Sequence, residues 1–251
     1  MINTVFNQII SSLNDYKLME KSTLSSNLKG GREVVSEHDK KIEDLIVHCI
    51  RSTFPDHNIV AEESEHGIKT DSEYTWFIDP IDNTVGFLAQ ENEVVSSISL
   101  KKESEHIESL IYFFNSNTYT LASQFGTYRE TSTLFTREKG VSTCAYVSDK
   151  HTDVAFSFYK SLWKNRLPLR ISGSAAHDLF MVAQGKRYAH VSFAAHPWDL
   201  EAGFHFVKQS GGVVHILKEM QDINCLAFIA ATDQQIIDEL LPFIPQTFYG
   251  V

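Results

Sequence analysis

Acidic residues follow two apolar stretches of this 251-residue chain and recur once more far downstream. Glu62 and Glu63 come after a short apolar run. Asp79 and Asp82 follow the hydrophobic run Trp-Phe-Ile, and Asp199 stands next to a tryptophan. Carboxylate oxygens at this density suit Mg²⁺ better than zinc. A lone Glu-Glu pair is more often solvated surface, and an Asp-x-x-Asp string can be a structural Asx-turn, so the metal-site prediction depends on all three segments.

The central segment could combine metal binding with phosphate binding. Pro80 biases Asp79 toward extended backbone, and two carboxylates three residues apart across such a turn can converge on one point. Asn83 and Thr84 follow, where a helix N-terminus would offer backbone N–H groups to an anion. A carboxylate pair beside an anion-binding turn is what a metal-assisted phosphatase requires, so this pattern favours that chemistry.

The elements that must position these residues can be predicted from periodicity. Apolar residues up to Glu20 have helical spacing, and a turn is expected at Gly30-Gly31. Ser36 and Asp39 resemble a capping box ahead of a second helix, which should stop before Pro55. Strands are expected at 58–61 and 74–78, and an antiparallel meander at 94–101, 109–114, 118–123 and 127–130.

The second half of the sequence alternates strands with helices. Gly185 and Gly211-Gly212 stand where helices should end. The pattern predicts two packed α/β parts, 1–135 with most of the metal ligands and 136–251 completing the site, within one structural unit. The expected strands are 144–147, 167–171, 188–193, 213–217 and 226–231, and the expected helices are 174–184, 198–209 and 234–241.

Composition and charge exclude some classes of function. Hydrophobic residues make up 43% and charged residues 22%, which is ordinary for a soluble globular protein. No apolar run approaches the roughly 18 residues of a membrane span, so no membrane partner is expected. The net charge is −10 without a Lys/Arg block, which argues against a nucleic-acid partner. Bound divalent cations would let so acidic a protein attract a phosphate ester.

The cysteines and the N-terminus favour the cytoplasm. Cys49, Cys144 and Cys225 are an odd, widely spaced set with apolar neighbours, as expected for free thiols in a reducing compartment rather than a redox or zinc site. The first 17 residues lack the basic start, apolar block and cleavage site of a secretory signal.

Together, three motifs resemble the inositol monophosphatase family of magnesium-dependent, lithium-sensitive phosphatases. They are Glu62-Glu63-Ser64, the segment Trp76-Phe-Ile-Asp-Pro-Ile-Asp-Asn-Thr84, and Trp198-Asp199-x-x-Ala202-Gly203. The resemblance extends from about residue 35 to residue 214 and also includes Ser36-x-x-Asp39 and Gly173-Ser-Ala-Ala176. It implies an α+β fold, a layered α/β/α/β/α sandwich of the sugar-phosphatase type.

The resemblance also implies roles for individual residues. Asp39 and Thr84 would orient and deprotonate the attacking water, with Glu62 assisting through a metal. Phosphate and substrate would contact Asn83, Thr84, Gly173, Ser174 and Asp199. The ligands of two or three Mg²⁺ ions would be Glu62, Asp79, the Ile81 carbonyl, Asp82 and Asp199. A homodimer acting on a small phosphorylated metabolite is expected from the resemblance alone.

The chain departs from the family at two informative positions. Asn83 stands where the family usually has glycine, and Asn is among the best substitutes if the backbone φ is positive there. Ser192 stands seven positions before Asp199, where inositol-specific members carry an acidic residue that contacts sugar hydroxyls. The motifs still support the chemistry, whereas these departures leave the substrate open among inositol phosphate and other polyol or sugar phosphates.

Other functions remain open at this point. One alternative is a histidinol phosphatase or a 3′-phosphoadenosine-5′-phosphate phosphatase, although the latter should need a basic cluster that is absent. Another is a regulatory protein that keeps the fold with weak catalysis. Haloacid dehalogenase-type phosphatases use Asp-x-Asp-x-Thr with a nucleophilic first aspartate, whereas the Asp79-x-x-Asp82 spacing favours direct attack by water.

Overall fold

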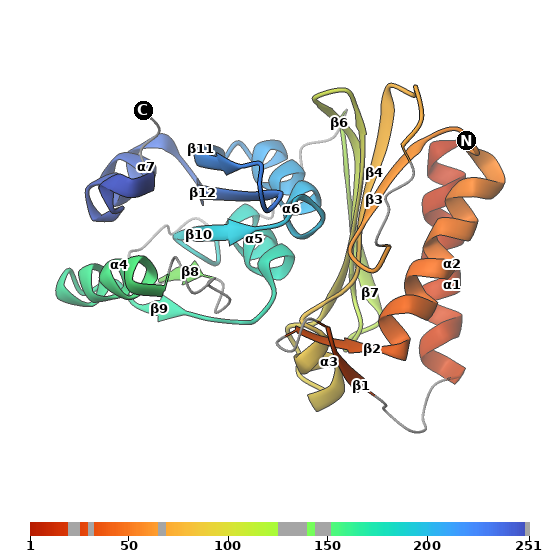
Figure 1. Ribbon diagram of the computed structural model, residues 1–251, viewed down its shortest axis with the longest axis horizontal. Coiled ribbons are helices and arrows are strands. Elements are labelled where there is room, and N and C mark those ends of the chain that lie inside the picture. The colour runs from red at the N-terminus through yellow and green to blue at the C-terminus, as the bar shows by residue number, and fades with distance from the viewer. Residues whose placement is uncertain (20–25, 30–32, 65–68, 125–139, 144–151, 249–251) are drawn as a thin grey trace. The chain divides into compact units, whose positions relative to one another are not determined.

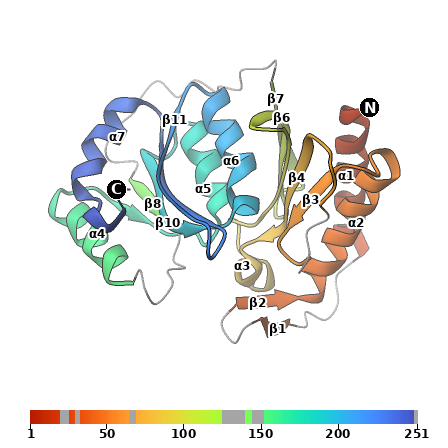
Figure 2. The same cartoon turned by 45° about the horizontal axis from the view of Figure 1, so that its top comes forward.

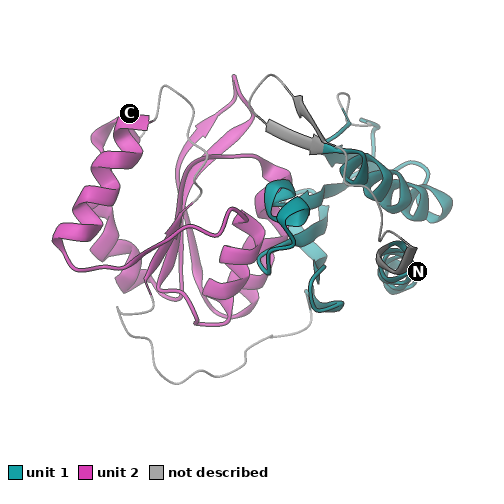
Figure 3. Ribbon diagram, turned by 90° about the horizontal axis from the view of Figure 1, so that it is seen from below, with its two compact units in different colours: residues 1–124 teal, residues 125–251 magenta. Residues whose placement is uncertain are grey.

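The structure is a computed structural model that describes residues 1–19, 26–29, 33–64, 69–124, 140–143 and 152–248 (Figure 1). The chain divides into two compact units, residues 1–124 and residues 125–251 (Figure 3). The predicted boundary between residues 135 and 136 lies outside the described residues and stays a prediction. The expected turn at Gly30-Gly31 and the expected strands at 127–130 and 144–147 also lie outside them.

Unit 1 is built on one five-stranded sheet. The predicted antiparallel meander is confirmed for its strands at 94–101, 109–114 and 118–123. The strand at 74–82 also pairs antiparallel with the first of these, whereas the first two strands of the sheet are parallel to each other. A separate pair of strands, β1 (Ser26–Lys29) and β2 (Glu33–Ser36), is antiparallel. The strand order in the sheet is β3 (Asn58–Ala61), β4 (Tyr74–Asp82), β5 (Val95–Lys102), β6 (Glu105–Phe113) and β7 (Thr118–Ser123).

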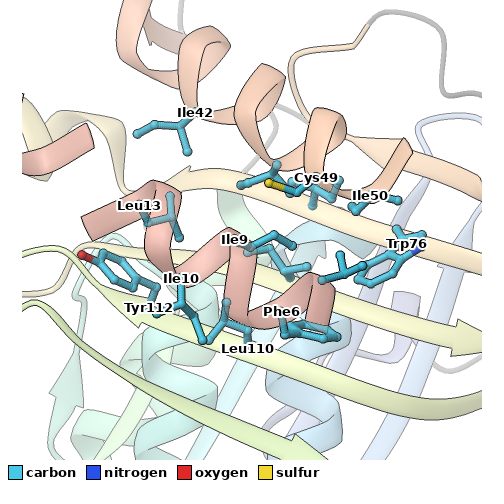
Figure 4. Close-up of a cluster of buried hydrophobic side chains, with 14 of the residues drawn as sticks. Phe6, Ile9, Ile10, Leu13, Ile42, Cys49, Ile50, Trp76, Leu110 and Tyr112 are labelled. Carbon is cyan, nitrogen blue, oxygen red and sulfur yellow. The ribbon is translucent and has the colours of Figure 1, made fainter. Parts of the chain in front are cut away.

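Two long helices cover one face of this sheet (Figure 1). They are α1 (Ile2–Met19) and α2 (Glu37–Thr53), both of which the helical periodicity predicts. Figure 4 shows how their apolar stripes meet the sheet, with Phe6 and Leu13 of α1 near Trp76 and Tyr112 of the strands. Burial of these large side chains fixes both helices against the strands that carry the acidic residues.

Unit 2 is a mixed sheet with helices on both faces (Figure 2). Helices α5 (Ala175–Ala183) and α6 (Pro197–Gln209) cover one face, and α4 (Thr152–Lys164) and α7 (Gln234–Leu240) cover the other. Short 3₁₀ turns, Leu241–Phe243 and Gln246–Phe248, follow α7. The strand order is β11 (Val213–Met220), β12 (Cys225–Ala231), β10 (Ala189–Ala195), β8 (Val141–Thr143) and β9 (Leu169–Arg170).

Helix α4 is absent from the sequence-based prediction. Its buried residues Ala155, Phe158 and Leu162 have helical spacing. Phe156 and Trp163 are 65% and 82% exposed. These apolar residues on the solvent-facing side hide the separation of apolar and polar faces by which an amphipathic helix is recognised. With these elements in place, the predicted α+β class is confirmed. None of the helices in the described part of the chain combines the length and hydrophobicity that a membrane-crossing helix requires.

Unit 2 buries a group of ionisable side chains around Asp178. The Nδ1 atoms of His190 and His177 lie 3.8 and 3.9 Å from the Asp178 carboxylate, and Arg187 Nε lies 3.8 Å from it. Ser142 Oγ lies 3.0 Å from His190 Nδ1. Burial, together with the Arg187 charge, lowers the pKa of His190 to about 3 and the pKa of His177 to about 4. Both rings are therefore neutral in the folded protein at pH 7.

The buried histidines predict a loss of stability in mild acid. In the unfolded chain the two histidines become protonated near pH 6.5, whereas in the folded protein they stay neutral to a much lower pH. The free energy of unfolding should therefore fall as the pH drops below 6.5. Each of the two rings should contribute about 2 kcal/mol between pH 7 and pH 5. Urea unfolding of His190→Gln should show a correspondingly smaller pH dependence. The same change at the exposed His48 is the control, and equal pH dependence in both variants would contradict this account.

Candidate active site

The predicted ligands of unit 1 gather because β3 and β4 are parallel. The carboxyl ends of parallel neighbours meet at one edge of a sheet, and Ala61 pairs with Ile78 there. Glu62 directly follows β3, and its N–H donates to the Ile78 carbonyl at 3.2 Å. Glu62 is thereby placed beside Asp79, the next residue of β4. Residues that are 17 positions apart in sequence thus share one sheet edge.

A β-bulge brings Asp82 to the same edge. The sequence predicts a turn after Ile78, and this prediction is wrong because β4 continues to Asp82. Asp79 pairs with Ser97 but Asp82 pairs with Val95, so β4 holds one residue more than β5 between these pairs. In a regular strand, residues three apart point to opposite faces, and the extra residue corrects this. Pro80 lies inside the bulge, where its missing N–H costs no ladder hydrogen bond.

The carboxylates at this edge interact strongly. Asp79 and Asp82 are 2% and 8% exposed. The pKa of Glu62 is raised to about 8, first by burial and then by the charge of Glu63, with further contributions from Asp39 and Asp82. A side-chain hydrogen bond with Asp79 acts in the opposite direction. The four predicted residues Asp39, Glu62, Asp79 and Asp82 are therefore brought together in unit 1.

Asp39 and Thr84 are in direct contact. The Thr84 hydroxyl donates to Asp39 Oδ1 at 2.8 Å and also lies 3.3 Å from the Ile81 carbonyl oxygen. The other oxygen of Asp39 accepts the Ser36 N–H at 2.8 Å and the Ser36 hydroxyl at 2.5 Å. Asp39 is fully buried, so these donors replace its hydration. The capping box that starts α2 thus also orients a carboxylate toward Thr84.

Asn83 has the left-handed backbone that its position requires, with φ of 77°. It is the N-cap of the short helix α3 (Thr84–Ala89), and its Oδ1 accepts the Gly86 N–H at 2.9 Å. Its Nδ2 donates to the Glu93 carbonyl at 3.2 Å. The expectation that Asn can keep this turn in place of glycine is confirmed. The side chain lies so close to Gly86 that a Cβ there would be 2.2 Å from Nδ2.

Three further predicted residues belong to unit 2. Gly173 has φ of 86°, and Ser174 is the N-cap of α5, accepting the His177 N–H at 3.0 Å. Asp199 lies in the first turn of α6, where its Oδ2 accepts the His196 N–H at 3.2 Å. Both positions are helix starts, as the sequence indicates. That these residues join those of unit 1 in one site stays a prediction.

Some residues hold the site in ways that the sequence does not predict, and one further position bears on the substrate. Ser36 is predicted only as a helix cap, although it also binds Asp39. Glu43 is not predicted at all, and its four-residue spacing from Asp39 on one helix face is the only signal in the sequence. Ser192 lies in β10 and is 1% exposed.

The donor atoms fit Mg²⁺ in their chemistry. They are carboxylate oxygens and the Ile81 carbonyl oxygen, and hard divalent cations prefer such ligands. A cation would also offset the burial and the neighbouring negative charges that raise the pKa of Glu62. In the described part of the chain, no three His, Cys, Asp or Glu side chains are arranged as a ready-made metal site. The fit therefore concerns the type of donor rather than a preformed coordination geometry.

The crowding of Asn83 and Gly86 generates one prediction. Gly86→Ala should lower both the thermal midpoint and the phosphatase activity that the family resemblance implies, because its Cβ would overlap the Asn83 side chain. Adding Asn83→Gly should restore much of both, since glycine tolerates positive φ and vacates the space. Melting curves and rate measurements on the two single variants and the double variant check this. A double variant no better than Gly86→Ala would show that the two side chains are not in conflict.

The pKa of Glu62 generates a second prediction. Folded Glu62 holds its proton up to about pH 8, so stability without metal should fall as pH rises from 4.5 through 8. Glu62→Gln removes the titrating group and with it this pH dependence. In EDTA its thermal midpoint should exceed that of the unmodified protein, and by more at pH 8.5 than at pH 6. The exposed Glu91→Gln is the control, and a midpoint difference that does not grow with pH would contradict the expectation.

Comparison with known proteins places the chain in a family. The model of the inositol monophosphatase family matches residues 4–242. A fructose-1,6-bisphosphatase/inositol-1-monophosphatase of Aquifex aeolicus is 32% identical over 207 residues, covering 76% of this chain and 75% of the relative. The Escherichia coli K12 protein named Nus factor SuhB is 27% identical over 226 residues, covering 87% of this chain and 85% of that protein.

A solved structure agrees. The inositol monophosphatase of Thermotoga maritima superposes with a TM-score of 0.77 at 26% identity, covering 97% of this chain and 96% of that one. The family model spans nearly the whole chain, and the fold is shared with this relative. The chain therefore belongs to the inositol monophosphatase family of phosphatases.

Proposed function

We propose that this protein is a Mg²⁺-dependent phosphomonoesterase that hydrolyses a small phosphorylated polyol or sugar by direct attack of water. The observation that carries the proposal is the 2.8 Å hydrogen bond from Thr84 to Asp39 beside the carboxylates of Glu62, Asp79 and Asp82. This arrangement combines a group that can accept a proton with donors that can hold cations. Membership of a phosphatase family supports the same chemistry.

The metal ligands proposed are those of the family resemblance. Glu62, Asp79, Asp82 and the Ile81 carbonyl would come from unit 1 and Asp199 from unit 2, around two or three ions. When bound, the cations would neutralise the phosphate charge and lower the pKa of a bound water molecule. The protein side chains supply the geometry, because the bulge and the β3–β4 pairing set where the carboxylates stand.

Asp39 and Thr84 would move the proton. The Thr84 hydroxyl donates to Asp39, so its oxygen lone pairs remain available to a water molecule. As the water oxygen bonds to phosphorus and the ester P–O bond breaks, the water proton passes to Thr84 while the Thr84 proton passes to Asp39. The alkoxide takes a proton from solvent and leaves as the alcohol, and Asp39 releases its proton to solvent. Ser36 keeps the Asp39 carboxylate from rotating away during this transfer.

The remaining predicted residues would hold the phosphate and the rest of the substrate. Asn83 and Thr84 would offer backbone N–H groups to the phosphate, and Gly173, Ser174 and Asp199 would contact the substrate. Ser192 lacks the charge of the acidic residue found in inositol-specific members, so fewer sugar hydroxyls would be recognised. Other polyol or sugar phosphates, histidinol phosphate and 3′-phosphoadenosine 5′-phosphate therefore belong in the same test.

A regulatory role is the second candidate, because one relative is named a Nus factor rather than a phosphatase. The two candidates predict different results in a single experiment. A panel of polyol, sugar, histidinol and nucleotide phosphates should include at least one that is hydrolysed with Mg²⁺ and inhibited by Li⁺. No turnover of any panel member at any Mg²⁺ concentration would reject the phosphatase and favour the regulatory candidate.

The relay predicts a difference between two substitutions at one position. Thr84→Val removes the hydroxyl at nearly constant volume and should lower kcat roughly 100-fold or more, the range of general acid–base catalysis. Thr84→Ser keeps the hydroxyl and should retain most of the activity. Steady-state kinetics at saturating Mg²⁺ measure both variants. Equal losses in the two would mean that the hydroxyl takes no part.

A further inference from the structure

A buried carboxylate outside the predicted ligand set faces the turn that carries Glu62. Glu43 lies on α2, four residues after Asp39, and is 4% exposed. Its Oε2 accepts the Glu63 N–H at 2.8 Å, and its Oε1 accepts the Ser64 hydroxyl. Both oxygens therefore receive protein donors, which suits a group that holds backbone rather than one that coordinates an ion.

These bonds fix the backbone on both sides of the Glu62 Cα. The N–H of Glu62 donates to the Ile78 carbonyl at 3.2 Å, and the next N–H along the chain donates to Glu43. With both flanking peptide groups tied, the direction of the Cα–Cβ bond of Glu62 is set. The Glu62 carboxylate is then aimed toward Asp79, with which it shares a hydrogen bond.

Helix α2 thereby connects two segments of the site that are distant in sequence. Asp39 and Glu43 are one turn apart and lie on the same helix face. Asp39 holds Thr84 at the start of α3, and Glu43 holds the segment that follows β3. Because the apolar face of α2 is buried against the sheet, the helix holds both carboxylates at fixed positions relative to these segments.

We propose that Glu43 is a positioning residue for metal binding, which acts by fixing the turn that presents Glu62. This inference rests on the proposed function, because it assigns Glu62 as a Mg²⁺ ligand. Glu43 acts through its two acceptor oxygens and not through its charge. Loss of such supporting partners typically lowers metal affinity roughly 10- to 100-fold.

Two substitutions separate geometry from charge. Glu43→Leu removes both acceptors at similar volume, whereas Glu43→Gln removes the charge but can still accept from the Glu63 N–H and donate to Ser64 Oγ. Mg²⁺ binding is measured by calorimetry without substrate. Glu43→Leu should bind Mg²⁺ roughly 10- to 100-fold more weakly, and Glu43→Gln should recover most of that loss. At saturating Mg²⁺ the kcat of both should approach that of the unmodified protein.

Controls keep the test decisive. Asp44→Asn makes the same charge change at the exposed neighbour on α2 and should leave Mg²⁺ affinity unchanged. Ser64→Ala removes one of the two donors and should weaken binding severalfold. If Glu43→Leu does not fold, the test depends on Ser64→Ala. A Mg²⁺ affinity of Ser64→Ala equal to that of the unmodified protein would then overturn the proposal.

Other outcomes also overturn it. Equal weakening in Glu43→Leu and Glu43→Gln would assign the effect to charge, and unchanged affinity in a folded Glu43→Leu would make the residue purely structural. A protein that binds Mg²⁺ but hydrolyses no phosphate would reject the proposed function while leaving this inference measurable. A protein that binds no Mg²⁺ at all would reject both.

Discussion

The burial of several carboxylates close together is the constraint around which unit 1 is organised. Glu62, Asp79 and Asp82 share one sheet edge, and Asp39 approaches from α2. Taking such groups out of water together is costly unless protons, donors or cations compensate them. The raised pKa of Glu62 expresses this cost directly. Such a cluster is stable only where strong packing elsewhere holds its carboxylates in place. Because bound cations would relieve the cost of burying these carboxylates, the same cluster would bind cations tightly.

That packing comes from the apolar layer behind the site. The stripes of α1 and α2 bury large side chains against β4 and β6, so α2 cannot slide relative to the strands. This rigidity lets Asp39 and Glu43 act as fixed acceptors for segments far away in sequence. The contacts of Ser36, Glu63 and Thr84 with these two carboxylates are local consequences of one immobile helix.

The Asn83 turn shows how this chain keeps the shape of the site with a different residue. Glycine would adopt the left-handed backbone without strain, and asparagine instead offers a side chain that bonds the Gly86 N–H and the Glu93 carbonyl. The compensation extends to Gly86, where any larger residue would meet the asparagine. The asparagine at position 83 therefore requires glycine at position 86. Gly86 by itself gives no sign of this requirement in the sequence.

The sequence by itself determined the local features. The periodicity predicts α1 and α2, Ser36 and Asp39 predict the start of α2, and the order of the acidic motifs predicts the family. These features depend on neighbours within a few residues, where spacing and residue type are sufficient. Helix α4 was missed because Phe156 and Trp163 point outward and hide its apolar face.

Only the tertiary structure decided how the predicted residues meet. The bulge in β4, the parallel pairing of β3 with β4 and the hydrogen bond between Glu43 and Glu63 all depend on contacts between residues that are distant in sequence. Strand register is set by the partner strand, and a buried acceptor is recognised only once its donor is placed. The sequence therefore names the chemical groups, and the packing of α2 against the sheet gives them their geometry.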